Sequence, residues 1–346
     1  MALTTRDAAL PAVYSQALES LSLGPLWSAL HQLLPSERTT RAVPHAWSWR
    51  AVRPLLHESA RLVPIEQAER RVLVLENPGL KGTYSITATL YAGLQIILPG
   101  EAAPSHHHTP AALRLVVEGA GAYTTVEGVK CVMEPGDLII TPPMRWHDHG
   151  HEGAAPMVWL DGLDIPLVRS FDASWASRMR PAQPLATATD SSQDELSGAG
   201  LVPRQSRYED TVYPQVRWPW QVARHALAAM VDGAPADRPV ALRYVNPRTG
   251  APPLATMGAE AQWLRPRERT RPERRTTSAV FHVIEGAGES RIGDSALAWE
   301  HGDTFVAPPW HWVEHVNAAD RPACLFQFND EPAVRALGLY QEETHV

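Results

Sequence analysis

The sequence predicts a mainly β protein with two antiparallel β-barrel modules behind a helical N-terminal arm. The first observation is that residues 113–143 hold short β-rich segments separated by Gly, Pro and Asp turns, which is typical of a small antiparallel barrel. The second is an internal repeat, in which Val116–Gly121 recurs as Val283–Gly288 and Glu134–His149 recurs as Glu300–His315. The chain of 346 residues therefore contains two copies of one module.

Residues 1–82 are expected to form the helical arm. Apolar residues recur at roughly helical spacing from Tyr14 to Leu34, and Gly24-Pro25 interrupts the pattern. A second helix is expected over Pro64–Leu75, where apolar residues lie on one side.

The two barrels are expected over residues 83–166 and 240–346. Residues 167–239 form the linker between them. A stretch rich in Pro, Ser, Ala, Gly and Asp over 180–207 predicts a long loop, and Val222–Val231 is expected to be helical.

Composition narrows the class of protein. With 44% hydrophobic residues the chain can build two cores. It has only two cysteines, Cys131 and Cys324, each in or beside an apolar segment, so we expect no disulfide framework and a cytoplasmic location. The sequence has no run of 18 apolar residues, and its first residues lack a basic region followed by an apolar run, so we expect neither a leader sequence nor a membrane partner. A net charge of -7 argues against a nucleic-acid partner.

Two histidine clusters predict a metal site in the first barrel. Side chains alternate faces along a strand, so His106 and His108 point the same way. His147, 39 residues after His108, can supply a third imidazole from a strand paired in space. Three neutral nitrogen ligands leave one side of a metal open, which is typical of a metal that takes part in chemistry.

The second barrel is expected to lack this metal site. Counting from the repeated motifs, the three histidines fall opposite Glu273, Arg275 and Val313. His149 has the counterpart His315, which has no ligand set beside it, and we expect His315 to be a hydrogen-bonding core residue.

These motifs resemble those of known families. Gly100 with His106 and His108 resembles the first cupin motif, and Pro135-Gly136-Asp137 followed by His147 resembles the second. More specifically, several segments look like the gentisate 1,2-dioxygenase family, which also includes salicylate and 1-hydroxy-2-naphthoate dioxygenases. The segments are Leu94–Glu101, Trp146–Gly150 and Pro156–Pro166, and the similarity runs through nearly the whole chain.

The resemblance implies a bicupin, usually a homotetramer, with one ferrous ion per chain in the first barrel. The implied ligands are His106, His108 and His147. Many cupins carry a further glutamate ligand, but that position is Ala112, so the implied site has no carboxylate. Family members use dioxygen to open a hydroxybenzoate ring between the carboxyl-bearing carbon and the adjacent hydroxyl-bearing carbon. The implied activity is the conversion of gentisate to maleylpyruvate.

The resemblance also implies a substrate pocket. Arg114 carries over as the clamp for the substrate carboxylate, and the planar fork of arginine suits a bidentate contact. Gln95 and Tyr91 lie at an even spacing on one strand face and line the pocket. A tyrosine at position 91 is more typical of the gentisate-cleaving members, because the salicylate-cleaving members tend to carry tryptophan there.

Three further polar residues match implied catalytic or pocket positions. His149 is the implied acid or base toward the substrate hydroxyl. Asp161 is expected to orient His149 or a water, and Arg70 to contact the substrate, with a purely structural ion pair as the alternative for both residues. Outward or loop positions without a catalytic role are expected for His107, Asp148 and His151.

Other functions are compatible with the same motifs. A salicylate, a substituted salicylate or 1-hydroxy-2-naphthoate could replace gentisate as substrate. Imidazole also binds zinc, nickel, cobalt and manganese, and a three-histidine zinc site would activate water in a hydrolase or lyase. A third possible function is that of a non-catalytic bicupin that binds a small acid.

Overall fold

The computed structural model describes residues 10–180, 185, 187–196, 201, 203–208 and 210–345. The chain divides into two units, residues 1–40 and 41–346. The described part of the first unit contains the helices α1 (Ala12–Ser20) and α2 (Leu26–Leu33), which confirms the predicted break at Gly24-Pro25. Neither helix has a buried residue, and large apolar side chains such as Trp27 are exposed.

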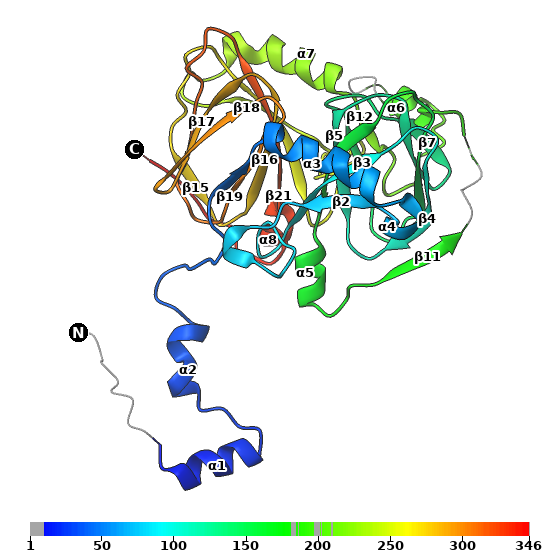
Figure 1. The fold of residues 1–346 in the computed structure, drawn as a ribbon. Helices are drawn as coiled ribbons and strands as arrows, with labels where there is room; N and C mark the ends of the chain where they lie inside the picture. Colours follow the sequence, from blue (N-terminus) through cyan, green and yellow to red (C-terminus); the bar gives the residue numbers. More distant parts are fainter. Residues whose placement is uncertain are drawn as a thin grey trace. The chain divides into compact units, whose positions relative to one another are not determined.

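The second unit contains two β modules that lie side by side (Figure 1). From the start of this unit to the end of the linker the elements are β1 (His45–Trp47), α3 (Trp49–Leu62), α4 (Ile65–Ala68), β2 (Arg71–Val74), η1 (Pro78–Leu80), β3 (Tyr91–Ile97), β4 (Ala102–His108), β5 (Ala112–Glu118), β6 (Ala122–Val126), β7 (Val129–Val132), β8 (Leu138–Thr141), β9 (His147–His151), β10 (Met157–Leu163), α5 (Ile165–Ser170), β11 (Ala176–Arg180), α6 (Ser191–Leu196) and β12 (Arg217–Trp218).

The second module repeats this order. Its elements are α7 (Trp220–Met230), η2 (Val231–Gly233), β13 (Val240–Arg243), β14 (Gly258–Leu264), β15 (Glu273–Arg275), β16 (Ala279–Glu285), β17 (Ala287–Ile292), β18 (Ser295–Glu300), β19 (Thr304–Ala307), β20 (Val313–Val316), β21 (Ala323–Asn329), α8 (Glu331–Ala336) and β22 (Glu342–Thr344). The helix expected over Val222–Val231 is confirmed as α7. The loop expected over 180–207 lies partly outside the described residues, and its described part contains α6.

Each module consists of two antiparallel sheets. In the first module the strand orders are β12-β8-β5-β10-β3-β2 and β11-β4-β9-β6-β7. In the second they are β1-β19-β16-β21-β14-β13 and β18-β17-β20-β15-β22. The repeated order reflects the internal repeat seen in the sequence.

The two modules exchange their first strands. β1 precedes the first module in the chain, yet it pairs with β19 of the second, with His45 opposite Val306. β12 precedes the second module, yet it pairs with β8 of the first, with Trp218 opposite Leu138. Because β8 and β19 hold the same place in the repeated strand order, the exchange is reciprocal.

A tryptophan after each exchanged strand fixes the start of a helix. The backbone N–H of Trp49 donates to Asp303 Oδ1 at 2.7 Å, and that of Trp220 donates to Asp137 Oδ1 at 2.9 Å. The glycine before each aspartate leaves room for the indole, since a Cβ at Gly302 would lie 2.5 Å from the Trp49 ring. The repeat therefore includes the Trp-X-Trp segments that start α3 and α7.

The region expected to be a helical arm, residues 1–82, also contains strands of both modules. β1 joins the second module, and β2 pairs with β3 of the first, with Arg71 opposite Ile96. The helix predicted over Pro64–Leu75 is wrong beyond Ala68, because Glu69 adopts a left-handed backbone (φ 53°) that ends α4. The β-branched Val72 and Val74 then favour a strand.

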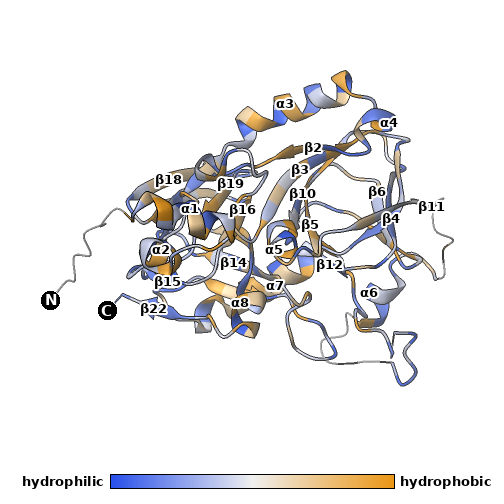
Figure 2. Cartoon of the chain, turned by 90° about the horizontal axis from the view of Figure 1, so that it is seen from below, coloured by the Kyte–Doolittle hydropathy of each residue, from blue (hydrophilic) through white to orange (hydrophobic). Residues whose placement is uncertain are grey.

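The modules share one apolar core. It includes Leu94 and Leu160 from the first module and Met257 and Phe326 from the second. α3 contributes the fully buried Leu56, and Figure 2 shows hydrophilic and hydrophobic turns alternating along this helix. Within the described ranges, no helix is long and apolar enough to cross a membrane.

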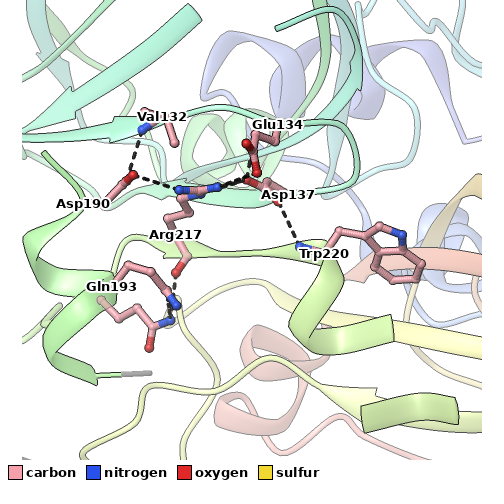
Figure 3. A network of polar contacts seen from close by, with 8 residues as sticks. Val132, Glu134, Asp137, Asp190, Gln193, Arg217 and Trp220 are labelled. Atoms are coloured by element: carbon pink, nitrogen blue, oxygen red, sulfur yellow. Dashed lines mark hydrogen bonds and ion pairs between the residues drawn. The ribbon is translucent and has the colours of Figure 1, made fainter. Parts of the chain in front are cut away.

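A buried arginine ties the linker to the first module (Figure 3). Arg217 of β12 reaches three carboxylates: Asp137 Oδ2 at 2.7 Å, Asp190 Oδ2 at 2.9 Å and Glu134 Oε2 at 3.2 Å. Asp190 also accepts from the backbone N–H of Val132. The network therefore joins residues that lie far apart in sequence around the turn before β8.

We expect the Arg217→Ala variant to lose about 3–5 kcal/mol of unfolding free energy, because Asp137 would remain buried without its cation. Denaturant unfolding measures this loss. The control is Arg267→Ala, which removes an exposed ion pair with Asp320 and should cost at most about 1 kcal/mol. Equal small losses in both variants would show that the Arg217 network does not hold the exchanged strand.

Candidate functional site

The three histidines of the predicted metal site lie together on β4 and β9. These strands pair with His106 opposite His147, and His108 follows two residues later on the same face of β4. One ring nitrogen from each lies within 4.8 Å of the other two. Among the described residues, these three form the only group of His, Cys, Asp or Glu with metal-ligand spacing.

Backbone carbonyls fix the tautomer of all three rings. The Nδ1 atom of His106 lies 3.0 Å from the Pro104 oxygen and that of His108 lies 2.7 Å from the Pro110 oxygen. The Nδ1 atom of His147 lies 2.9 Å from the backbone oxygen of residue 145. A carbonyl can only accept, so each Nδ1 donates and each Nε2 keeps its lone pair. This is the tautomer in which Nε2 can bind a metal.

The electrostatics also suit a cation. Burial lowers the pKa of His106 to about 3 and that of His108 to about 4, and it lowers the pKa of His147 well below the usual value. All three rings are therefore neutral at physiological pH. Among the described residues, the buried His147 Nε2 has no hydrogen-bond partner, and the Arg70 guanidinium contacts His106 Nε2. These residues fit a divalent metal, because the three Nε2 lone pairs converge and that of His106 already lies against a positive group.

The second module places other residues at the equivalent positions. Glu273 lies opposite Val313, in the register that pairs His106 with His147. Glu273 forms an ion pair of 2.9 Å with Arg275, the counterpart of His108. The correspondence inferred from the repeat is therefore correct.

His315 is the hydrogen-bonding core residue that the sequence predicts. Its Nδ1 lies 2.7 Å from Ser290 Oγ. In the first module, His149 Nδ1 lies 2.9 Å from Thr124 Oγ1, so both modules keep a hydroxyl beside this histidine. Burial lowers the pKa of His149 well below the usual value, and its Nε2 has no partner among the described residues.

Arg114 and Asp161 form a buried ion pair on adjacent strands. They lie opposite each other on β5 and β10, with Arg114 Nε 3.0 Å from Asp161 Oδ1. Arg114 Nη1 donates to Thr141 Oγ1 at 3.1 Å, and the Trp159 indole donates to Asp161 Oδ2 at 3.1 Å. Burial lowers the pKa of Arg114 to about 10, with Asp161 acting against this, so the guanidinium stays charged.

A cavity of about 380 Å³ is lined both by one of the three histidines, His108, and by this ion pair. Its walls bring together the ligand His108 and all the predicted pocket residues except His149. The polar lining residues are Arg70, Tyr91, Gln95, His108, Arg114, Asp161 and Ser174. The apolar lining includes Val72, Leu163, Ile165 and Trp175, so the cavity combines charged and apolar surface.

Two expectations about individual residues need correction, and a third is settled in part. Of the alternatives for Asp161, the structure shows the ion pair, with Arg114, while Thr124 is the residue that contacts His149. Asp148 and His151 are not outward or loop residues, because both are buried in β9.

The sequence analysis missed Trp175 and Thr124. Trp175 lines the cavity from the linker and packs edge-on against His107, with ring centroids 5.2 Å apart. No local motif marks it. Thr124 could have been found, because it faces His149 across the pairing of β6 with β9.

The comparisons with known proteins agree with this geometry. The family described as "Cupin domain" matches residues 93–163. The chain is 41% identical over 329 residues to "Gentisate 1,2 dioxygenase 1" of Aquipseudomonas alcaligenes, covering 94% of each chain. It is 43% identical over 339 residues to "Gentisate 1,2-dioxygenase" of Ralstonia sp, covering 96% of this chain and 94% of the relative.

A solved structure agrees over almost the full length. It is the salicylate 1,2-dioxygenase of Pseudoaminobacter salicylatoxidans in adducts with gentisate, with a TM-score of 0.91 and 34% identity. The match covers 99% of this chain and 96% of that chain. The predicted mainly β bicupin fold and the predicted family are thus both confirmed. This chain belongs to the gentisate 1,2-dioxygenase family of bicupin ring-cleaving dioxygenases.

Proposed function

We propose that this protein is an iron(II)-dependent dioxygenase that opens gentisate between its carboxyl-bearing and adjacent hydroxyl-bearing carbons to give maleylpyruvate. The observation that carries the proposal is the cavity that links His108 to the buried cation Arg114. A hydroxybenzoate has the matching features, with a carboxylate on one side of an apolar ring.

His106, His108 and His147 would hold the ion through their Nε2 atoms. Bound ferrous iron supplies a Lewis acid that lowers the pKa of a phenol and an electron source that lets an aromatic acid react with dioxygen. The neutral ligand set supports this assignment, because three imidazoles leave the full double charge of the ion available to anionic substrate oxygens.

Arg114 binds the substrate carboxylate in this proposal. Its guanidinium lines the cavity, with Nε 3.0 Å from Asp161 Oδ1 and Nη1 donating to Thr141 Oγ1. Asp161 acts as a positioning residue, because its carboxylate fixes the guanidinium from the adjacent strand. A charged donor buried in this way binds a carboxylate more strongly than an exposed one.

Tyr91, Gln95 and Arg70 contact the rest of the substrate. Burial and then the nearby Asp161 carboxylate raise the pKa of Tyr91, so its phenol stays protonated and can donate to a ring substituent such as the second hydroxyl of gentisate. The buried Gln95 offers both a donor and an acceptor. Arg70 contacts His106 Nε2 and lines the same cavity, so its guanidinium could pair with an anionic substrate beside a bound cation.

His149 is the proposed proton carrier for the substrate hydroxyl. It lies beside the ligand His147, with ring centroids 5.6 Å apart. Burial keeps the ring neutral, and Thr124 holds Nδ1, so Nε2 is the atom that accepts or returns a proton.

Oxygen consumption tests the proposed activity. Anaerobically iron(II)-loaded protein is offered gentisate, salicylate and 1-hydroxy-2-naphthoate in turn, and absorbance of the ring-opened product is recorded. We expect uptake with gentisate and little with the others. Zinc-loaded protein is the control, because zinc has no redox chemistry and should give no uptake.

The outcomes separate the alternatives. Equal uptake with salicylate or 1-hydroxy-2-naphthoate would show that Tyr91 does not select the substrate. No uptake with any of them, in protein with one iron per chain, would favour a substituted salicylate or a non-oxygenase cupin.

We also propose that the protein is a cytoplasmic homo-oligomer, a tetramer by analogy with its family. Free, buried Cys131 and Cys324 support the reducing compartment. In the first unit the exposed apolar residues Leu26, Trp27 and Leu33 support an assembly role.

Sedimentation tests the assembly. The double variant Leu26→Ser, Trp27→Ser is expected to lower the sedimenting mass, because it removes exposed apolar area that an assembled arm would bury. Leu337→Ser, which changes an equally exposed leucine in the second module, should leave the mass unchanged. An unchanged mass in both variants would exclude α2 from the interface.

A further inference from the structure

The second module keeps a cavity where the first has its histidine centre. This cavity has a volume of about 200 Å³ and is lined by Glu273, Arg275 and Val313, the counterparts of the three histidines. Because a water occupies about 30 Å³ in the liquid, the space can hold several waters or a short organic molecule. The ligand set has therefore been replaced without filling the space.

Three carboxylates and three arginines line this cavity, and all three carboxylates act on one of the arginines, Arg275. Arg275 pairs with Glu273 at 2.9 Å and with Glu342 at 3.4 Å. Glu260 of β14 is a third carboxylate facing it. Burial alone would lower the pKa of Arg275, but the three carboxylates together raise it. One guanidinium thus faces three carboxylates.

The other two arginines of the lining do not restore the balance. Arg271 pairs with Asp237, which lies outside the lining, and Arg238 is exposed. Burial, and then the nearby Glu331, raise the pKa of Glu260, and Arg275, a hydrogen bond with Gln262 and Arg243 offset this only in part. An additional positive group beside Glu260 would therefore be stabilised.

A buried acceptor beside these carboxylates has no partner. Gln262 lies two residues from Glu260 on the same face of β14 and is only 6% exposed. Its Nε2 donates to Gln327 Oε1 at 2.7 Å, while its Oε1 has no hydrogen-bond partner among the described residues. A buried acceptor left without a donor destabilises the protein, and a donor in the cavity would satisfy it.

The arrangement disfavours two simpler ligands. A single metal ion needs ligand atoms close together, and among the described residues only the three histidines of the first module have that spacing. An anion would compete with the carboxylates that already surround Arg275. The remaining match is a positive donor carried on a short carbon chain, which Phe281 and Val313 can contact.

We propose that the cavity of the second module binds a small organic cation with a primary ammonium or guanidinium group. The positive group lies between Glu260 and Gln262 Oε1, and its carbon chain packs on Phe281 and Val313. This site is separate from the proposed dioxygenase centre, and binding there does not require iron.

Isothermal titration of the full chain tests the proposal with four probes: n-butylammonium, 1,4-diaminobutane, n-butanol and acetate. We expect one equivalent of each cation to bind and neither the alcohol nor the anion to bind. The His108→Ala variant, which lacks the proposed metal site, should bind the cations unchanged. This result separates the proposal from the dioxygenase function.

Glu260→Gln should weaken cation binding by about tenfold or more, the value of one charge-assisted hydrogen bond. Glu289→Gln, on the exposed side of the same module, is the matched control and should bind as the parent does. Thermal unfolding verifies that both variants are folded, and Gln262→Met provides a second test should Glu260→Gln fail to fold.

Four results would overturn the proposal. The first two are that n-butanol binds as tightly as n-butylammonium and that acetate binds. The third is that the His108→Ala protein binds Mn²⁺ tightly in place of the organic cations. The fourth is that neither cation gives heat in the millimolar range. Cation binding that Glu260→Gln leaves unchanged would place the site elsewhere.

Discussion

The His108→Ala variant is expected to lose bound iron and oxygen uptake together while keeping its fold. His108 supplies one of three converging ring nitrogens, and its Nδ1 bonds only to the Pro110 carbonyl. Loss of a residue that only orients a metal ligand typically lowers metal affinity roughly 10–100-fold. Loss of the ligand His108 itself should lower it by more. Iron per chain, oxygen uptake and the circular dichroism melt are the three measurements.

A surface histidine provides the control for this result. His301→Ala removes an exposed ring in the second module and should leave iron content and uptake unchanged. Oxygen uptake retained by iron-depleted His108→Ala protein would contradict the metal assignment. A melting temperature so low that the variant is unfolded under the assay conditions would explain the loss of activity and would instead assign His108 a structural role.

The Arg114→Met variant is expected to lose about 30- to 4,000-fold in kcat/KM with iron still bound. This corresponds to the 2–5 kcal/mol that removal of one partner of a buried charge pair typically costs. The same change leaves Asp161 buried without a cation and should destabilise the fold by about 3–5 kcal/mol. A single substitution therefore confounds two effects.

Adding Asp161→Asn separates them. The double variant Arg114→Met, Asp161→Asn has no unpaired buried charge, so stability should return while activity stays low. If activity returned together with stability, Arg114 would have only a structural role. Full activity in the single variant would contradict the carboxylate clamp. Arg224→Met, which removes a half-exposed ion pair with Glu285, is the matched control.

The convergence of the three histidines could be predicted because it depends on local rules. Alternation along β4 places His106 and His108 on one face, and His147 is expected on a strand paired with it in space, which the pairing of β4 with β9 shows. The surroundings of His149 depend on a pairing of β6 with β9 that the histidine motif does not encode. Trp175 reaches the cavity from a segment without any pattern, so only the fold reveals it.

The errors in the predicted elements have a similar cause. Over Pro64–Leu75 the apolar spacing suits a helix, but a strand can pair with β3 there, and this tertiary pairing decides the outcome. α3 was missed, although its Trp-X-Trp start recurs before α7. The repeated motifs that reveal the two modules lie inside them, whereas the first turns of α3 and α7 lie outside them.

The exchange of first strands constrains how the chain can fold during synthesis. The strand β1 leaves the ribosome early, but its partner β19 is made near the end, so β1 must wait unpaired through most of translation. The first module likewise lacks β12 until the linker is complete. An exposed strand edge is an aggregation hazard, and such long-range pairing is slow to form. Nascent chains should therefore depend on chaperones until synthesis of the second module is complete.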